Sequence, residues 1–215
     1  MKATGRATVL AGIAALALAA GAAAAVIVGT SGDDRLVGTA DADQIRALAG
    51  DDHVWSRGGN DTVGAGSGDD ATEAGTGHDE VFGGRGNDGS SGGPGNNRLE
   101  GGSGDDRLNG GEGNDKAAGG PGDDAVAGGD DNDSLYGGWG TDRAFGGPGN
   151  DRLHALAPDG QVDLLDCGPG HDTAIIRRSE RRLTRLVGCE QVVIVETGTA
   201  EDEAAENADT DQEAE

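Results

Sequence analysis

Aspartates and glycines recur at regular spacing through the middle of this 215-residue sequence. From Gly29 to His154 the chain divides into fourteen consecutive nine-residue units without an insertion or a deletion. The sixth residue of each unit is Asp, except for Asn97, and the fourth is Gly, except for Asp41 and Asp131. Glycine permits turns whose carbonyl oxygens face inward, and calcium prefers carboxylate and carbonyl oxygens as its ligands. The spacing therefore predicts turns that bind calcium.

The candidate metal ligands are the side chains at the sixth position of the units. After His154 the phase is lost for twelve residues, and one further unit at residues 167–175 restores it. The complete set of candidate ligands is Asp34, Asp43, Asp52, Asp61, Asp70, Asp79, Asp88, Asn97, Asp106, Asp115, Asp124, Asp133, Asp142, Asp151 and Asp172.

Each unit also predicts one short strand, at its seventh to ninth residues. The eighth residue is Leu, Ile or Val in ten of the fourteen units. Because side chains alternate along a strand, the eighth points inward while the seventh and ninth point outward. One unit can neither bury its single aliphatic side chain nor complete a metal shell, whereas stacked units can do both.

The units GGSGDDRLN (residues 101–109) and GGPGNDRLH (residues 146–154) resemble the repeats-in-toxin (RTX) family, the haemolysin-type calcium-binding nonapeptide repeat. The resemblance implies an all-β fold, a right-handed parallel β-roll (a solenoid) in which two units form one coil. It also implies that calcium lies between turns stacked on the same side, held by turn carbonyls and the sixth-position Asp. Six gaps on each of two edges then give up to about twelve Ca²⁺ sites.

The composition does not suit an ordinary apolar core. Aromatic residues make up 2% of the chain and 43 residues are Gly. The free energy gained by burying apolar side chains is therefore small relative to the cost of the conformational entropy lost on folding. Forty Asp and Glu against sixteen Lys and Arg give a net charge of −24, and nucleic acid is not expected as a partner because its phosphates would be repelled. Without metal the stacked carboxylates would repel one another, so we expect folding coupled to Ca²⁺.

The N-terminal segment predicts a signal peptide at residues 1–25. Lys2 and Arg6 precede an Ala/Leu-rich stretch that ends in small residues, and cleavage is placed after Ala25. The alternative is an uncleaved membrane anchor, because about 19 apolar residues could just span a bilayer. Cleavage would leave a secreted, extracellular chain without stable membrane insertion, whose β-roll domain comprises residues 26–154.

Residues 155–195 are expected to form the terminal repeat and a short cap, because solenoids need their last coil covered. The Arg residues between positions 177 and 185 fit a solvated face of this cap, and an anionic partner is the alternative. Cys167 and Cys189 predict a disulfide that contributes roughly 3 kcal/mol in an exported protein, with a two-Cys metal site as the alternative. Residues 196–215 are acidic and are expected to be disordered.

Together these features predict a secreted calcium-binding repeat protein that serves as a structural or interaction module. Catalysis is not expected, because the four His residues lie in different units without a nucleophile or a metalloprotease motif. A calcium-dependent adhesin of a cell surface or matrix, and an accessory protein of a haemolysin-like toxin, are the alternatives. No patch of residues identifies a protein or glycan partner.

The inward-facing eighth-position side chains form one row from the odd-numbered units and one from the even-numbered units. These two rows should differ in how strongly they stabilise the roll. The eighth residues of the even-numbered units are Leu, Ile or Val except for Ala117, whereas those of the odd-numbered units include Thr72 and Ser90 on adjacent rungs, with Asn97 in the unit after Ser90. We therefore expect the weakest coils near residues 65–100. Hydrogen exchange at low calcium should show this stretch opening first, and uniform exchange along the chain would contradict the expectation.

Overall fold

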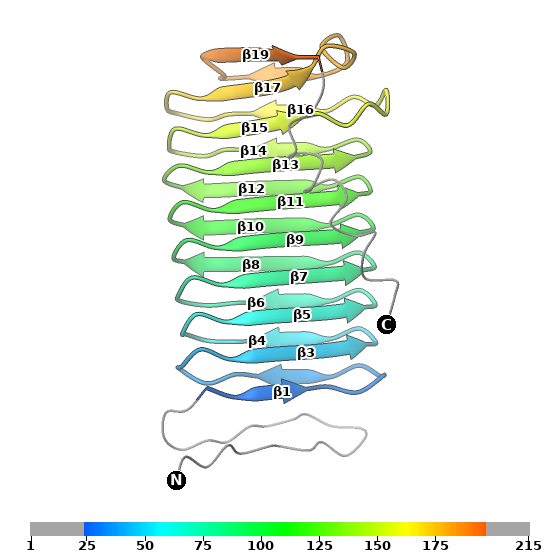
Figure 1. The fold of residues 1–215 in the computed structure, drawn as a ribbon, viewed down its shortest axis with the longest axis vertical. Helices are drawn as coiled ribbons and strands as arrows, with labels where there is room; N and C mark the ends of the chain where they lie inside the picture. The colour runs from blue at the N-terminus through cyan, green and yellow to red at the C-terminus, as the bar shows by residue number, and fades with distance from the viewer. Residues whose placement is uncertain (1–23, 197–215) are drawn as a thin grey trace.

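The computed structural model describes residues 24–196, in which the chain forms short strands and no helix. The strands wind into a β-roll, and successive strands alternate between two facing sheets (Figure 1). Each strand pairs in parallel with the strand two places further along, as in the pairing of Leu108 with Val126. The register step of eighteen residues confirms the prediction that two units form one coil.

The two sheets contain all nineteen strands of residues 24–196. The first sheet has ten strands, in the order β1 (Val26–Val28), β3 (Gln44–Ala49), β5 (Thr62–Ser67), β7 (Glu80–Arg85), β9 (Arg98–Ser103), β11 (Lys116–Pro121), β13 (Ser134–Trp139), β15 (Arg152–Ala155), β17 (Thr173–Arg177) and β19 (Gln191–Val195). The second sheet has nine strands, in the order β18 (Arg185–Val187), β16 (Leu164–Asp166), β14 (Arg143–Phe145), β12 (Ala125–Asp130), β10 (Arg107–Glu112), β8 (Gly89–Pro94), β6 (Ala71–Glu73), β4 (His53–Trp55) and β2 (Arg35–Val37).

Most strands in the middle of the roll are longer than the three residues predicted. β10 and β12, for example, are six residues long. The first three residues of the following unit continue the pairing, so that Gly111 lies opposite Gly129. Glycine allows this extension because it accepts the positive φ that the second position adopts, 116° at Gly111.

The eighth-position side chains face the interior, as predicted. They form two ladders of buried residues, one from each sheet, and Ile27 of β1 adds a rung before the first complete unit. Thr72 and Ser90 occupy adjacent rungs, and within residues 24–196 the Thr72 hydroxyl has no hydrogen-bond partner. A buried hydroxyl without a partner costs about 1–3 kcal/mol, so a weak packing of the coils at these two rungs keeps a physical basis.

The loss of phase after His154 is a shift of three residues. Ala155, Leu156 and Ala157 are buried, and the pairing of Leu153 with Ala174 spans 21 residues instead of eighteen. The prediction of twelve residues without phase was therefore wrong, because residues 158–166 already form a unit in step with residues 167–175. Strands β16 to β19, in the region expected to be a terminal repeat and cap, extend both sheets.

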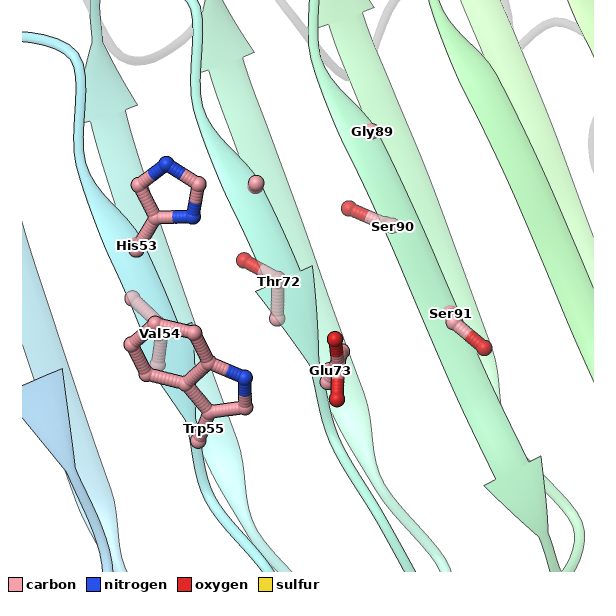
Figure 2. A pocket seen from close by; sticks show the side chains of 9 residues that line it. His53, Val54, Trp55, Thr72, Glu73, Gly89, Ser90 and Ser91 are labelled. Atoms are coloured by element: carbon pink, nitrogen blue, oxygen red, sulfur yellow. The ribbon is translucent and has the colours of Figure 1, made fainter.

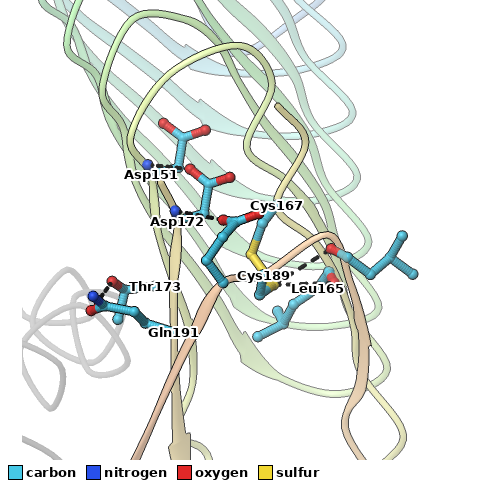
Figure 3. Close-up of a disulfide and its surroundings, with 9 residues drawn as sticks. Asp151, Leu165, Cys167, Asp172, Thr173, Cys189 and Gln191 are labelled. Carbon is cyan, nitrogen blue, oxygen red and sulfur yellow. Dashed lines mark hydrogen bonds between the residues drawn. A yellow bond between two sulfur atoms is a disulfide. The ribbon is translucent and has the colours of Figure 1, made fainter. Parts of the chain in front are cut away.

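The last coils are joined by a disulfide between Cys167 and Cys189, which confirms the predicted bond (Figure 3). The two Cα atoms lie 5.2 Å apart, and Cys167 is completely buried. Residues 1–23 of the predicted signal peptide and residues 197–215 of the acidic tail lie outside the described residues. Among residues 24–196 there is no helix of the length and apolarity needed to cross a membrane.

Three residues other than glycine adopt positive φ, among those the structure describes. Leu48 (88°) and Arg57 (80°) stand at the second position of their units, and Asp131 (79°) stands at the fourth. Left-handed geometry is expected of Asp131, because Asp tolerates it better than most residues. Asp41, the other replacement of a fourth-position Gly, is not among the residues with positive φ.

The turn glycines should be far more sensitive to substitution than glycines elsewhere in the same strand. Gly66 has a φ of 117°, and an added Cβ would collide with the Leu48 carbonyl oxygen, whereas a Cβ on Gly64 would meet nothing within 4 Å. We expect Gly66→Ala to lower the free energy of unfolding by about 2 kcal/mol or more, and the matched control Gly64→Ala to change it by less than about 0.5 kcal/mol. Thermal unfolding in calcium checks this, and equal effects of the two substitutions would contradict it.

Candidate metal centre

The sixth-position residues lie just before the strands, at the turns of the roll, with their side chains enclosed. All fifteen predicted ligand residues are at most 4% exposed. Burying a carboxylate is costly unless it is paired with a cation or with hydrogen-bond donors. The surroundings of each carboxylate oxygen therefore decide what these turns can bind.

From Asp43 onward, the Oδ1 atom of each of these residues accepts a backbone N–H from the preceding coil. The backbone N–H of Asp34 donates to Asp52 Oδ1 (2.7 Å), and that of Asp106 donates to Asp124 Oδ1 (2.7 Å). The same bond repeats along both edges of the roll. Figure 3 shows one of its last members, where the N–H of Asp151 donates to Asp172 Oδ1 (2.8 Å).

The second carboxylate oxygen, Oδ2, is buried without a donor in most turns. Within residues 24–196 these oxygens accept no hydrogen bond in Asp52, Asp61, Asp70, Asp79, Asp88, Asp115, Asp124, Asp133, Asp142, Asp151 and Asp172. An orphaned buried carboxylate oxygen of this kind calls for a positive charge.

The first two turns are different because threonine replaces the second Gly. Thr30 donates to Asp34 Oδ2 through both its backbone N–H (2.5 Å) and its hydroxyl (2.9 Å). Thr39 donates its N–H to Asp43 Oδ2 (2.6 Å) and its hydroxyl to Asp43 Oδ1 (3.1 Å). Asp34 and Asp43 were predicted as ligands like the others, but the structure gives their carboxylates local donors.

The first-position Gly leaves the space around Oδ2 open. A Cβ on Gly119 would collide with Asp124 Oδ2 and would lie 2.5 Å from the carbonyl oxygen of Gly137, in the next coil. The same pair of oxygens, from the unit's own Asp and from the next coil's first residue, flanks Gly83 and Gly146. Oxygens that converge without donors fit a hard cation such as Ca²⁺.

Carboxylates alone do not complete such a site. No three His, Cys, Asp or Glu side chains gather around one point in the described part of the chain. Calcium takes six to eight oxygens, so the Asp side chains of neighbouring coils would need turn carbonyls beside them. The glycine-rich turns supply these carbonyls.

Burial raises the pKa values of many of these carboxyl groups, and in several the stacked carboxylates add to the effect. Burial, together with the nearby carboxylates of Asp142 and Asp106, raises the pKa of Asp124 to about 8, against the lowering effect of the Asp106 N–H. Burial likewise raises the pKa of Asp70 and of Asp133 to about 7. The sites therefore attract positive charge, whether it comes from a proton or from a metal ion.

The repeat family is identified by comparison with known protein families. The family model for the RTX calcium-binding nonapeptide repeat matches residues 28–63, 64–89, 91–126 and 118–153. The chain belongs to this family. No curated protein matches it. RTX repeats bind calcium, and the buried, regularly spaced Asp residues fit that role.

The structure adds one RTX position that the sequence analysis missed. Asp163 is 6% exposed, and its Oδ1 accepts the N–H of Asp142 (3.1 Å) in the same way as the sixth-position residues of the repeats. Its signal in the sequence is its place nine residues before Asp172 and two before Leu165, which is buried like the other eighth-position residues. At the end of the other edge, Glu190 Oε2 accepts the N–H of Asp172 (2.9 Å).

A second ladder runs along the outside of the RTX turns, at the fifth position. On one edge the exposed side chains include Asp33, Asp51 and Asp69, and each Oδ1 accepts a backbone N–H from the next coil. On the other edge amides such as Asn114 and Asn132 make the same bonds. One edge of the roll is therefore acidic on its outside, and the other is largely uncharged.

A hollow of about 290 Å³ lies on the nine-stranded sheet over β4, β6 and β8. Figure 2 shows His53 and Trp55 on its β4 side, with Glu73 and Ser91 on the neighbouring strands. The His53 and Trp55 rings stack at 5.6 Å between centroids. The hollow coincides with small residues on the outer face, Ala71 and Gly89, which leave room beside the larger rings.

The raised pKa values predict an unusual pH dependence for the metal-free chain. Folded-state pKa values of about 6 to 8, above the ordinary 3.8, mean that the folded chain binds protons more tightly than the unfolded chain. Their contribution to stability is therefore fully present at acid pH and is lost as the pH rises through about 6 to 8.

We expect the β-structure that the chain retains in a calcium chelator, measured by circular dichroism, to be greater at pH 5.5 than at pH 8.5, where the carboxylates are ionised. In saturating calcium the ion replaces the proton, so the trend should weaken or reverse. Metal-free β-structure that increases from pH 6 to pH 8.5 would show that these carboxylates are not the dominant titrating groups.

Proposed function

We propose that this RTX chain is a secreted structural or interaction module whose β-roll folds on calcium. The observation that carries the proposal is the row of buried Oδ2 atoms without donors, several of which, such as those of Asp88, Asp115 and Asp124, lie near a carbonyl oxygen of the next coil. Divalent ions between the coils would neutralise these oxygens and join each turn to the next. The ions then take the place of the apolar core that the composition cannot provide.

The residues proposed to hold the ions are the sixth-position aspartates of both edges together with the carbonyls of the turns. Asp163 and Asp172 extend the two rows beyond the regular repeats. The proposed number of Ca²⁺ ions is up to about twelve, since the fourteen regular repeats have six gaps between stacked turns on each edge and each gap can take one ion. Affinity per site should be about 10⁻⁴–10⁻³ M, as in extracellular calcium modules.

Secretion is supported by two features of different kinds. The first is the Ala/Leu-rich N-terminal segment behind Lys2 and Arg6. The second is the Cys167–Cys189 disulfide, which suits an oxidising compartment. Extracellular calcium would keep such weak sites filled, so the roll would fold after export.

The proposal includes no catalytic step. His53, His78, His154 and His171 lie in separate coils of the described chain. The His78 side chain belongs to the outer ladder of the turns, where its Nδ1 accepts the N–H of Asn96 (2.8 Å), and the His53 and His154 rings stack on Trp55 and Tyr136. These side chains are thus placed by the repeat, at the fifth, seventh and ninth positions of their units.

Calorimetric titration of the full chain with Ca²⁺, followed in parallel by circular dichroism, tests the proposed function. We expect β-structure to appear with calcium and to be lost in EGTA, with cooperative binding of several ions. Saturation at one or two ions, or an unchanged β spectrum in EGTA, would refute the stacked sites.

Two neighbouring aspartates provide a matched pair of variants for the same titration. Asp124 is completely buried in the inner row, whereas Asp123 is exposed in the outer ladder. Asp124→Ala should lower the stoichiometry by at least one ion and raise the calcium concentration at half-folding. Asp123→Ala should leave the stoichiometry unchanged.

A further inference from the structure

Asn97 is the one sixth-position residue of the fourteen repeats that is not Asp, and it keeps its place in the hydrogen-bond ladder. Its Oδ1 accepts the N–H of Asp79 (3.0 Å), and its own N–H donates to Asp115 Oδ1 (2.6 Å). The backbone donor of Asp79 requires an acceptor, and this requirement orients the amide so that Nδ2 takes the direction of the orphaned Oδ2 in other turns.

The amide nitrogen of Asn97 lies among the oxygens that would otherwise face an ion. Nδ2 donates to the carbonyl oxygens of Gly93 (3.1 Å) and Gly95 (3.2 Å) in its own turn, and to that of Gly110 (3.3 Å) in the next coil. Its two hydrogens are shared among these three acceptors. The second- and fourth-position carbonyls and the first-position carbonyl of the next coil therefore converge at this point of the turn.

A comparison with the next turn on the same edge, that of Asp115, shows how the Asn97 turn differs. A Cβ on Gly92 would lie 2.6 Å from Asn97 Nδ2 and 2.5 Å from the Gly110 oxygen. A Cβ on Gly110 would collide with Asp115 Oδ2 and lie 2.5 Å from the Gly128 oxygen. The backbone surroundings are the same, but the side-chain atom is a donor in one turn and an orphaned acceptor in the other.

We propose that the Asn97 amide takes the place of the calcium ion in its turn, so that this turn closes without metal. An NH₂ group aimed at the carbonyls satisfies them and would repel a cation placed between them. This inference rests on the proposed function, since it identifies the turn that calcium does not occupy. It also divides one edge into two calcium rows, with Asp43, Asp61 and Asp79 on one side of Asn97 and the row that begins at Asp115 on the other.

The edge formed by the odd-numbered units has no such interruption. Its sixth-position residues are Asp from Asp34 to Asp142, and Asp163 continues the row. In the middle of the roll, calcium is therefore needed on one edge, while the opposite edge has one turn that is already closed. In the sequence analysis, Asn97 was one of the features that predicted a weak stretch. Its three hydrogen bonds instead keep this turn ordered without calcium.

Calcium stoichiometry of two variants on the same edge tests this inference in the full chain. Asn97→Asp restores the orphaned oxygen and should bind one more Ca²⁺ than the unmodified chain. Asp115→Asn places an amide in the next turn of that edge and should bind one fewer. If Asn97→Asp binds the same number of ions as the unmodified chain while Asp115→Asn loses one, the inference is overturned.

Hydrogen exchange of the unmodified chain gives a second readout that needs no variant to fold. Over a descending series of calcium concentrations, peptides covering residues 92–97 should stay protected after those covering residues 101–106, the next turn on the other edge, have begun to exchange. Loss of protection in both at the same calcium concentration would contradict a metal-free closed turn. A chain that binds no calcium would instead refute the proposed function, so the two failures are distinguishable.

Discussion

The repulsion between stacked, buried carboxylates is the constraint on which the rest of the structure depends. Parallel pairing at a step of eighteen residues places identical turn positions directly above one another. An Asp in each turn then becomes a row of charges at strand spacing, out of contact with water. One oxygen of each is satisfied by a backbone N–H, and the other needs a positive charge or a donor.

The chain meets that need in three chemically different ways. In the first two turns Thr30 and Thr39 supply local N–H and hydroxyl donors. At Asn97 an amide reverses the polarity of the group, so that it donates to the surrounding carbonyls. Most of the remaining turns keep a bare carboxylate oxygen, in several of them near a carbonyl of the next coil, which is the arrangement that suits calcium. A regular repeat thus contains sites that differ in their need for metal.

The interior of the roll is narrow because glycine occupies so much of each turn. One buried aliphatic side chain per unit makes a single row inside each sheet, and even this row is interrupted where Thr72 lies beside Ser90. Such a core gives each coil contact only with its neighbours, as in other solenoids. Bonds between coils, from the Asp ladder and from the Cys167–Cys189 disulfide, therefore matter more here than in a globular domain.

The sequence alone determined the repeat, the parallel β-roll, the inward row of eighth-position residues and the disulfide. It could do so because a nine-residue period is a local pattern, and because its glycines, aspartates and aliphatic residues each have one physical role at a given position. It also predicted the sixth-position residues as metal ligands, and all fifteen lie buried at the turns.

Only the tertiary structure decided which of those residues have the same hydrogen-bonding surroundings. Whether an Oδ2 atom is orphaned depends on the residue four places earlier in the turn, as Thr30 shows beside Asp34, and the Asn97 amide is positioned by a carbonyl of the next coil, that of Gly110. The three-residue shift at residues 155–157 hid Asp163, because the coil absorbs the extra residues in a buried turn while the strands keep their pairing. Contacts between coils join residues that are eighteen or twenty-one positions apart. They are determined by the stacking of the coils, so the sequence of a single unit does not reveal them.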